Sequence, residues 1–123
     1  MKNRYIIITG TSKGIGKFLC NEYIKRGYVV FGCSRSESDI KHENYHHYIT
    51  DVTIESDIKK MMLKIKSITK NIDFLINNAG VASMNHIITT PYKSFENLVN
   101  TNFLGTFLFT REVSKLMMKN GGK

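Results

Sequence analysis

Three closely spaced glycines near the start of the chain could bind a phosphate through backbone amides. They lie in the segment Thr9-Gly10-Thr11-Ser12-Lys13-Gly14-Ile15-Gly16, between an apolar β-branched run and a helical pattern. At a helix N-terminus, amide groups can approach a pyrophosphate closely where glycine leaves no Cβ in the way. A plain glycine turn would have a similar composition, but the order of strand, loop and helix favours phosphate binding.

The spacing of these glycines argues against two common phosphate-binding motifs. A P-loop would need a glycine five residues after Gly10, where Ile15 stands. It would also need a Ser or Thr after its Gly-Lys pair, where Phe18 stands. The widespread dinucleotide fingerprint, with glycines at spacings of two and then three, is not met either. The pattern that remains is Gly-x3-Gly-x-Gly with Thr9 in front.

Three further motifs follow the glycine loop. They are Asp51-Val52, Asn77-Asn78-Ala79-Gly80 and Thr101-Asn102-Phe103-Leu104-Gly105-Thr106-Phe107. Together with the loop, they resemble the short-chain dehydrogenase/reductase family over essentially all 123 residues, which is about the first half of a complete member. The resemblance implies an NAD(P)-dependent oxidoreductase that transfers hydride between its cofactor and a carbonyl or alcohol substrate.

The resemblance also implies a role for each motif. Asp51 is similar to the family's adenine contact, and the Asn-Asn-Ala-Gly segment to the lining of its cofactor crevice. Asn102 is the implied catalytic residue of this half, supporting a helix irregularity and a water in the proton relay. A complete family member is expected to form a homo-oligomer. The predicted cofactor-binding residues are Gly10, Ser12, Lys13, Gly14, Ile15, Gly16, Arg35, Asp51, Val52, Asn78, Ala79 and Gly80.

The end of the predicted second strand indicates which nicotinamide cofactor is bound. NAD-binding members of the family usually carry an acidic residue there, and it accepts hydrogen bonds from the ribose 2′-hydroxyl. Here Ser34 and Arg35 stand instead. A guanidinium favours a 2′-phosphate, and Lys13 supplies a second cation. Both could be ordinary surface cations, and Glu37 and Asp39 argue the other way, but the pair favours NADP(H) over NAD(H).

Hydrophobic patterning predicts the elements that must position these residues. The predicted strands cover residues 4–9, 28–33, 45–49 and 72–77. The predicted helices cover about 15–26, 53–71 and 90–119, the last with a break near 97–102. Thr53 is the expected N-cap of the second helix, and Pro91 the expected first residue of the third. The chain is therefore predicted to be one α/β domain, residues 1–123, with a Rossmann-like doubly wound parallel sheet in strand order 3-2-1-4.

Composition bounds the partners. The formal net charge is +8, but the lysines are scattered over predicted helix faces and no nucleic-acid-binding motif accompanies them, so solvated surfaces are expected. The apolar runs are too short for a signal peptide or a membrane span, which predicts a soluble, cytoplasmic protein. Cys20 and Cys33 are expected to be reduced core thiols. Because His46 and His47 are adjacent in a strand and face opposite ways, no metal site is expected.

The family's catalytic pair, a tyrosine with a lysine four residues later, does not occur in these residues. Residues Thr9, Gly27, Gly32, Ile49, Val52 and Glu96 stand four positions after the six tyrosines. We expect truncation before the fifth strand, which in the family carries the catalytic serine. That would leave the apolar fourth strand as an exposed edge. Two alternatives are a non-catalytic dinucleotide-binding module and a methyltransferase that uses the same sheet for S-adenosylmethionine.

A polypeptide limited to residues 1–123 is expected to show no dehydrogenase or reductase turnover. Without the tyrosine, no group supplies the acid catalysis that is typically worth ~10²–10⁴-fold in rate. The measurement is NADPH and NADH oxidation by purified protein of this length against a panel of aldehydes and ketones. Robust oxidation of either cofactor would contradict the prediction.

Overall fold

The computed structural model describes residues 2–82 and 86–119. Its four strands form a parallel sheet in the order β3-β2-β1-β4. They are β1 (Arg4–Thr9), β2 (Tyr28–Ser34), β3 (Tyr45–Ile49) and β4 (Phe74–Ile76). The predicted α/β fold, with its doubly wound strand order 3-2-1-4, is confirmed.

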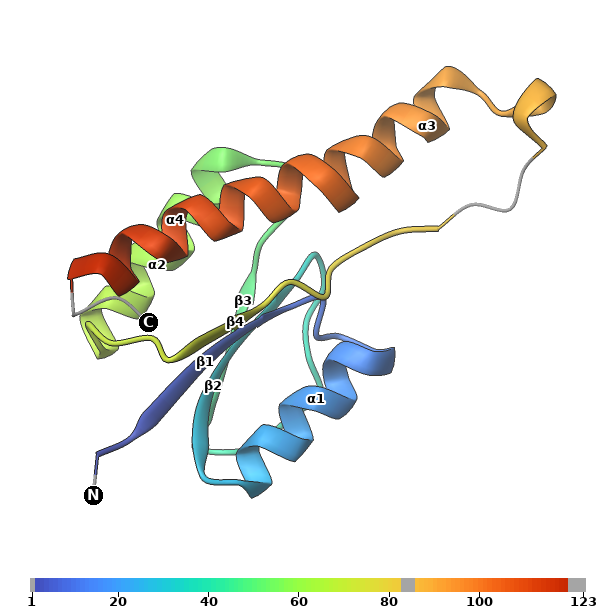
Figure 1. The fold of residues 1–123 in the computed structure, drawn as a ribbon. Coiled ribbons are helices and arrows are strands. Elements are labelled where there is room, and N and C mark those ends of the chain that lie inside the picture. The colour runs from blue at the N-terminus through green and yellow to red at the C-terminus, as the bar shows by residue number, and fades with distance from the viewer. Residues whose placement is uncertain (1, 83–85, 120–123) are drawn as a thin grey trace.

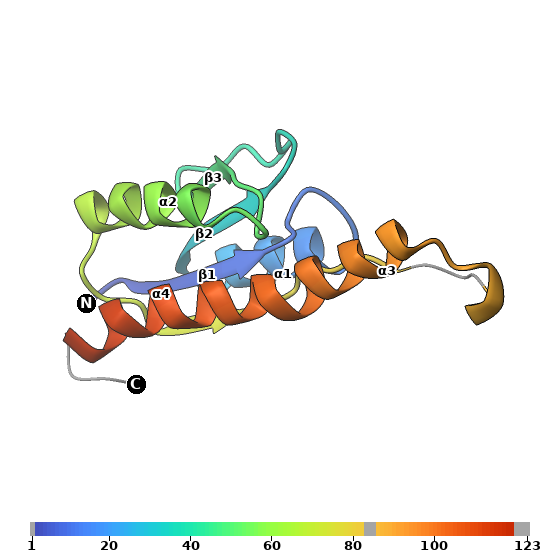
Figure 2. The ribbon, with the colours of Figure 1, turned by 90° about the horizontal axis from the view of Figure 1, so that it is seen from above.

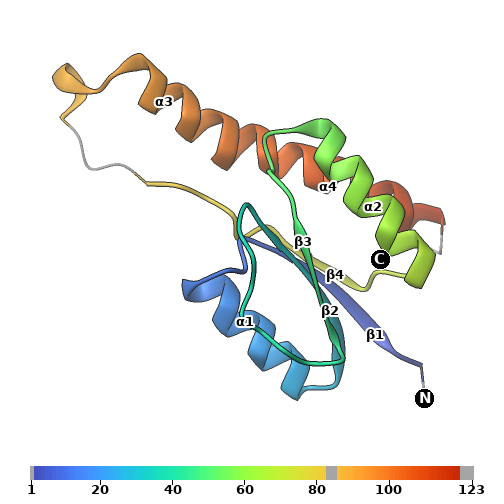
Figure 3. The ribbon, with the colours of Figure 1, turned by 180° about the vertical axis from the view of Figure 1, so that it is seen from behind.

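The helices cover both faces of this sheet. Figures 1 and 3 show α1 on one face, and α2 and α4 on the other. Figure 2 shows that α3, η2 and α4 form an almost continuous rod, whose α3 end extends past the sheet. The helical elements are α1 (Gly14–Lys25), α2 (Glu55–Ile68), the 3-10 turn η1 (Ile87–Thr89), α3 (Tyr92–Val99), the π-helix η2 (Asn100–Leu104) and α4 (Gly105–Lys119).

The central strands are buried on both faces because successive side chains point to opposite sides of a sheet. Ile6 and Ile8 of β1 pack in the cluster that includes Cys20 of α1. Ile7, between them, packs in the cluster on the other face. The helix residues of that second cluster are Ile58, Met61, Met62 and Ile65 of α2, and Phe109, Val113 and Leu116 of α4. One apolar strand thus joins two hydrophobic layers, and this explains its continuous β-branched run.

The start of α2 differs from the prediction. Thr53 was the expected N-cap, but Ile54 holds that position and has no capping side-chain hydrogen bond. The hydroxyl of Thr53 donates to Oδ1 of Asp51 at 2.6 Å, and its backbone N–H donates to the same oxygen at 2.9 Å. These two bonds hold Thr53 against Asp51 in the turn before the helix, one residue ahead of the N-cap.

The start of α3 also differs. Pro91 was predicted to be the first helical residue, but its ψ of 142° is extended, and it occupies the N-cap position. The hydroxyl of Thr90 donates to the carbonyl of His86 at 2.8 Å, so it closes the preceding 3-10 turn. The helix consequently begins one residue later, at Tyr92.

The apolar side chains of α1 are only partly buried. Cys20 is fully covered, and Leu19 and Tyr23 pack against its cluster. Ile15 and Phe18, which share the helical spacing, have 71% and 62% of their surface exposed. Ile15 lies in the first turn and lines the cleft described below.

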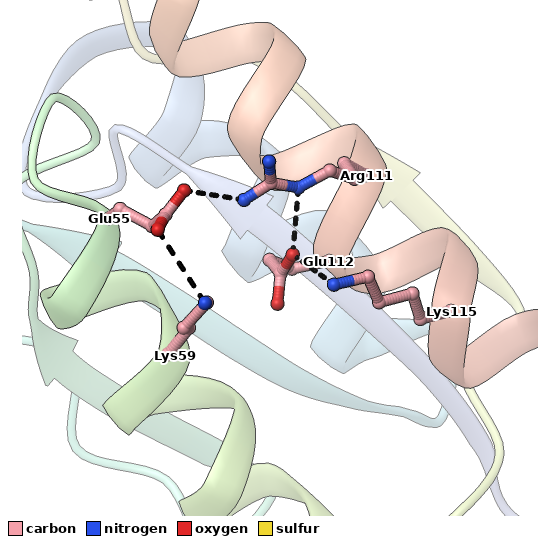
Figure 4. A network of polar contacts seen from close by, with 5 residues as sticks. All are labelled: Glu55, Lys59, Arg111, Glu112 and Lys115. Atoms are coloured by element: carbon pink, nitrogen blue, oxygen red, sulfur yellow. Dashed lines mark hydrogen bonds and ion pairs between the residues drawn. The ribbon is translucent and has the colours of Figure 1, made fainter.

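An ion-pair network holds α2 against α4 (Figure 4). Arg111 of α4 donates to Glu55 of α2 at 2.6 Å and to its neighbour Glu112 at 2.9 Å. Lys115 donates to the same Glu112 oxygen at 2.8 Å, and Lys59 lies 3.5 Å from the other oxygen of Glu55. The Glu112 side chain is only 9% exposed, so its charge depends on these partners.

The sheet leaves β4 as an edge strand. Phe74 is exposed, while Leu75 and Ile76 are half-buried, so only part of the expected apolar edge is open. Within the described ranges, no helix combines the length and apolar character needed to cross a membrane.

Replacing Glu112 by Gln is expected to lower the urea midpoint of unfolding at pH 7 but to have little effect at pH 3. The hydrogen bond from Lys115, with a second from Arg111, lowers the pKa of Glu112 below its ordinary value of 4.5. Because the pKa is lower in the folded state, the stabilisation is complete above the unfolded pKa. It is lost as the pH falls through the folded pKa.

The measurement is urea unfolding followed by circular dichroism at pH 7, 5 and 3. The control is Glu96→Gln, which removes the exposed ion pair with Lys93 on α3 and should change the midpoints little. A constant difference between Glu112→Gln and the original chain from pH 7 to pH 3 would contradict the assignment.

Candidate cofactor-binding site

A cleft of about 710 Å³ opens at the carboxyl ends of the strands. Such a volume lies within the roughly 300–1,000 Å³ typical of small-molecule sites. In a doubly wound sheet the expected position is the switch point, which here lies between β1 and β4. The predicted site residues that line the cleft are Gly10, Ser12, Lys13, Gly14, Ile15, Arg35, Asp51, Val52, Asn78, Ala79 and Gly80.

The glycine loop has the geometry that required glycine. Gly10 and Gly14 have φ values of +72° and +61°, a region that other residues rarely adopt. A Cβ on Gly10 would lie 2.8 Å from the Cα of Ala79. Gly16 lies behind the cleft rather than in its lining, and a Cβ there would collide with the carbonyl of Gly10. The loop and the first turn of α1 can therefore pack closely only with glycine at these positions.

The N-terminus of α1 has its backbone N–H groups open to the cleft. Lys13 occupies the N-cap with extended backbone and makes no capping side-chain hydrogen bond. The first turn of the helix contains no acidic residue. Unpaired N–H groups and the positive end of the helix dipole favour an anion, so this end of the cleft suits the pyrophosphate of a dinucleotide.

The Asn-Asn-Ala-Gly segment ties three elements together at the switch point. Asn77 Nδ2 donates to the hydroxyl of Thr110 in α4 at 3.1 Å, and Asn78 Nδ2 donates to the carbonyl of Gly10 at 3.1 Å. The backbone N–H groups of Asn78 and Ala79 both donate to the hydroxyl oxygen of Thr9, at 3.0 and 2.9 Å. Sequence reasoning gave Thr9 no role beyond its place in the motif, because the acceptor and its donors lie about 70 positions apart.

Asn102 lies in the π-helix and outside the cleft lining. Its side chain forms a two-way bond with the backbone of Val81. Nδ2 donates to the Val81 carbonyl at 2.9 Å, and Oδ1 accepts from the Val81 N–H at 2.8 Å. The residue thus fixes the chain just after Gly80. The helix irregularity implied for this position is present, and the catalytic role of Asn102 stays a prediction.

The adenine end of the predicted site is built around Asp51 and Val52. Oδ1 of Asp51 accepts from both the N–H and the hydroxyl of Thr53, which fixes the carboxylate at the cleft. Val52 is buried, and a Cβ on Gly105 would lie 2.8 Å from its Cγ2. Gly105, the first residue of α4, therefore lets this helix start directly against this wall of the cleft.

Lys13 and Arg35 line the cleft from the glycine loop and from the end of β2. Both are exposed, and neither forms a salt bridge with the residues that the structure describes. Asp39, which could have neutralised them, is held by Lys17 at 2.8 Å. The hydrogen bond from Lys17 lowers the pKa of Asp39, so it remains a carboxylate committed to α1.

Eight further residues, which were not predicted from the sequence, also line the cleft. Asn97 and Thr101 are four positions apart, so they share one face of the last helical stretch. That spacing was the available signal, but it became informative only once the helix was seen to approach the sheet. The others are Cys33, Ser34, Ser36, Thr50, Thr53 and Val81.

The cysteines and histidines do not form a reactive centre. Cys20 and Cys33 are free and buried, as predicted, and burial raises the pKa of each thiol to about 12. His46 stacks on Phe31 while His47 bonds to Tyr45, so the two imidazoles serve different faces of β3. Between residues 2–82 and 86–119, no group of three potential ligands could hold a metal ion.

A parallel sheet with a glycine loop and an open helix N-terminus at its switch point defines a dinucleotide-binding fold of the doubly wound class. The chain belongs to the short chain dehydrogenase family, whose family model matches residues 4–123. The family contains NAD(P)-dependent oxidoreductases.

Known relatives resemble the chain along nearly its whole length. It is 33% identical to the NADPH-dependent pterin aldehyde reductase of Arabidopsis thaliana over 94% of this chain and 51% of that protein. It is 29% identical to the NADPH-dependent 3-dehydrocapnine reductase of Ornithobacterium rhinotracheale over 93% and 43%. The solved structure of ElxO with NADP bound matches with a TM-score of 0.90 at 30% identity, over 98% and 53%. The chain spans about half the length of these relatives.

Replacing Thr9 by Val is expected to destabilise the fold by about 1–3 kcal/mol. Valine has nearly the same shape but leaves the N–H groups of Asn78 and Ala79 without their acceptor. The control is Thr9→Ser, which keeps the hydroxyl and should cost only about 0.8 kcal/mol for the lost methyl group. Urea unfolding of the three proteins measures both effects, and equal midpoints for Val and Ser would exclude this role of the hydroxyl.

Proposed function

We propose that these residues form the cofactor-binding half of an NADP(H)-dependent oxidoreductase that interconverts a carbonyl and an alcohol. The cofactor supplies the hydride when it is bound. The residues of this chain hold its adenosine and pyrophosphate, and Lys13 and Arg35 select for the 2′-phosphate. The nicotinamide half of the site and the substrate pocket depend on parts of the family's fold that these residues do not supply.

The observation that carries the proposal is that two cations, Lys13 and Arg35, line the cleft without an ion pair to any residue that the structure describes. A 2′-phosphate placed there would gain charge-assisted hydrogen bonds from Arg35 and Lys13 without displacing an existing ion pair. An acidic residue at the end of β2 would repel that phosphate, but Ser34 stands there, and Asp39 is bound to Lys17. Glu37 is exposed and lies outside the cleft lining.

Three of the similar proteins support the same choice of cofactor, whereas other matching structures contain NAD+ or NADH. The pterin aldehyde reductase and the 3-dehydrocapnine reductase are both described as NADPH-dependent, and the ElxO structure contains NADP. Their substrates differ, so they offer no common substrate for this chain. The proposal therefore names the cofactor and the reaction class.

The protein is expected to bind 2′,5′-ADP more tightly than 5′-AMP, and Arg35→Ala should remove most of that preference. Loss of one charge-assisted contact costs about 1.5–3 kcal/mol, which corresponds to roughly 10- to 100-fold in affinity. Arg35→Asp should reverse the preference, because a carboxylate repels the phosphate and accepts from the ribose hydroxyl. Calorimetry at fixed ionic strength, on the full natural chain that carries these residues, measures all three proteins.

Lys41→Ala is the matched control. It removes an exposed cation from the same loop, outside the cleft lining, and should leave the preference unchanged. Equal affinity of the original protein for the two nucleotides would overturn the choice of NADP(H), while leaving the family unaffected.

A further inference from the structure

The segment that carries Arg35 is held by one imidazole from the neighbouring strand. Nε2 of His47, in β3, lies 2.8 Å from the carbonyl oxygen of Ser36 and 3.1 Å from Oγ of Ser34. The Ser34 hydroxyl also donates to the Ser36 carbonyl, at 2.7 Å. His47 therefore binds the residues on both sides of Arg35, just where β2 ends and the chain enters the loop.

The second nitrogen of the imidazole faces inward. Nδ1 of His47 lies 2.7 Å from the hydroxyl of Tyr45, which lies 2.9 Å from the hydroxyl of Thr11 in the glycine loop. Thr11 and Tyr45 are buried, and Gly32 makes room for them, because a Cβ there would collide with the Tyr45 hydroxyl. A chain of side-chain hydrogen bonds thus joins the glycine loop to the Arg35 segment.

The donors and acceptors of this chain are consistent with one ring tautomer. With the ring proton on Nε2, that nitrogen donates to the Ser36 carbonyl, and Nδ1 accepts from the Tyr45 hydroxyl. The Tyr45 oxygen can then accept from the Thr11 hydroxyl, which also lies 3.3 Å from the Cys33 carbonyl. Each end of the imidazole has a separate partner, so the ring acts as a spacer of fixed length between the buried tyrosine and the exposed loop.

The support from His47 affects the position of the Arg35 side chain. Its side chain is long and exposed, and its ability to meet a phosphate depends on where the backbone between Ser34 and Ser36 lies. A contact geometry about 1 Å away from the productive one forfeits much of a directional, charge-assisted hydrogen bond. Fixing both neighbours from a buried anchor therefore sets the direction in which the guanidinium projects into the cleft.

We propose that His47 is a positioning residue that sets the selectivity for a 2′-phosphorylated cofactor by holding Ser34 and Ser36 on either side of Arg35. This proposal rests on the proposed function, since it assigns the support of the same phosphate-binding corner. His47 itself is not in the lining of the cleft and contacts no cofactor atom in the proposal. Its effect is confined to the end of the site where the 2′-phosphate would lie.

The test compares three substitutions at this position. His47→Phe keeps an aromatic ring but removes all three hydrogen bonds of the imidazole. In His47→Asn, the shorter amide can replace Nδ1 and reach Tyr45, but it cannot reach Ser36. In His47→Gln, the amide nitrogen can take the place of Nε2 and donate to Ser36. The affinities for 2′,5′-ADP and 5′-AMP are measured by calorimetry on the full natural chain, and a thermal melt checks the folding of each variant.

In the Phe and Asn variants, the ratio of the two affinities should fall by roughly 3- to 10-fold, a part of what full loss of a charge-assisted contact costs. Affinity for 5′-AMP should stay within about two-fold, because the glycine loop and Asp51 still hold the adenosine and its phosphate. The Gln variant should keep most of the original ratio. A purely structural role would instead lower both affinities together and leave the ratio unchanged.

Each result decides the matter. If the original protein prefers 2′,5′-ADP and the Phe and Asn variants keep its ratio, the role of His47 is overturned and the choice of NADP(H) survives. If Gln falls as far as Phe, the hydrogen bond to Ser36 is not the cause, and the proposal fails. If Phe does not fold, Asn carries the same comparison. A ratio of one in the original protein overturns the proposed function and this inference with it.

Discussion

The close contact between the end of β1 and the start of the Asn-Asn-Ala-Gly segment is the constraint on which the cleft depends. The hydroxyl of Thr9 accepts hydrogen bonds from the backbone N–H groups of Asn78 and Ala79. The segments that follow β1 and β4 are therefore bonded to each other where they leave the sheet. Gly10 can then pass beside Ala79 only because it has no Cβ. Hydrophobic burial holds the layers together but has no preferred direction, so these directional bonds set where the strands diverge and the cleft opens.

The bonds that shape the cleft extend outward from that contact. The Gly10 and Thr11 N–H groups both donate to the Cys33 carbonyl, which joins the glycine loop to the end of β2. On the other side of the cleft, the Asn102 side chain forms two hydrogen bonds with the backbone of Val81 and so joins the segment after β4 to the π-helix. The walls of the cleft are therefore connected through backbone groups, and a change in one strand end is transmitted to its neighbours. Residues outside the lining, such as Thr9 and Asn102, therefore help to set the shape of the site.

The strands and their order could be predicted from the sequence, because they depend on local hydrophobic patterns. Helix starts and side-chain hydrogen bonds could not, because they depend on which of several partners a side chain meets in the folded chain. The strand order could be predicted because the apolar run of β1 and the alternation of elements permit few topologies. The N-cap at Thr53 was wrong because the turn that Thr53 forms with Asp51 delays the helix by one residue, so Ile54 holds the N-cap position. The chain from Thr11 to His47 could not be foreseen, since it requires the register that sets Gly32 beside His47.

The two helices that follow strands β1 and β3 begin in opposite ways, and the difference locates the function. α2 has Glu55 and Asp57 in its first turn, where carboxylates offset the positive end of the helix dipole. Neither helix has a capping side-chain hydrogen bond, but α1 also has no acidic residue in its first turn, although such a residue stabilises an ordinary helix. Its N-cap is a lysine, which adds positive charge to a positive helix end. A sequence departs from local preferences in this way where a ligand completes the structure, and the ligand required here is an anion held at the mouth of the glycine loop.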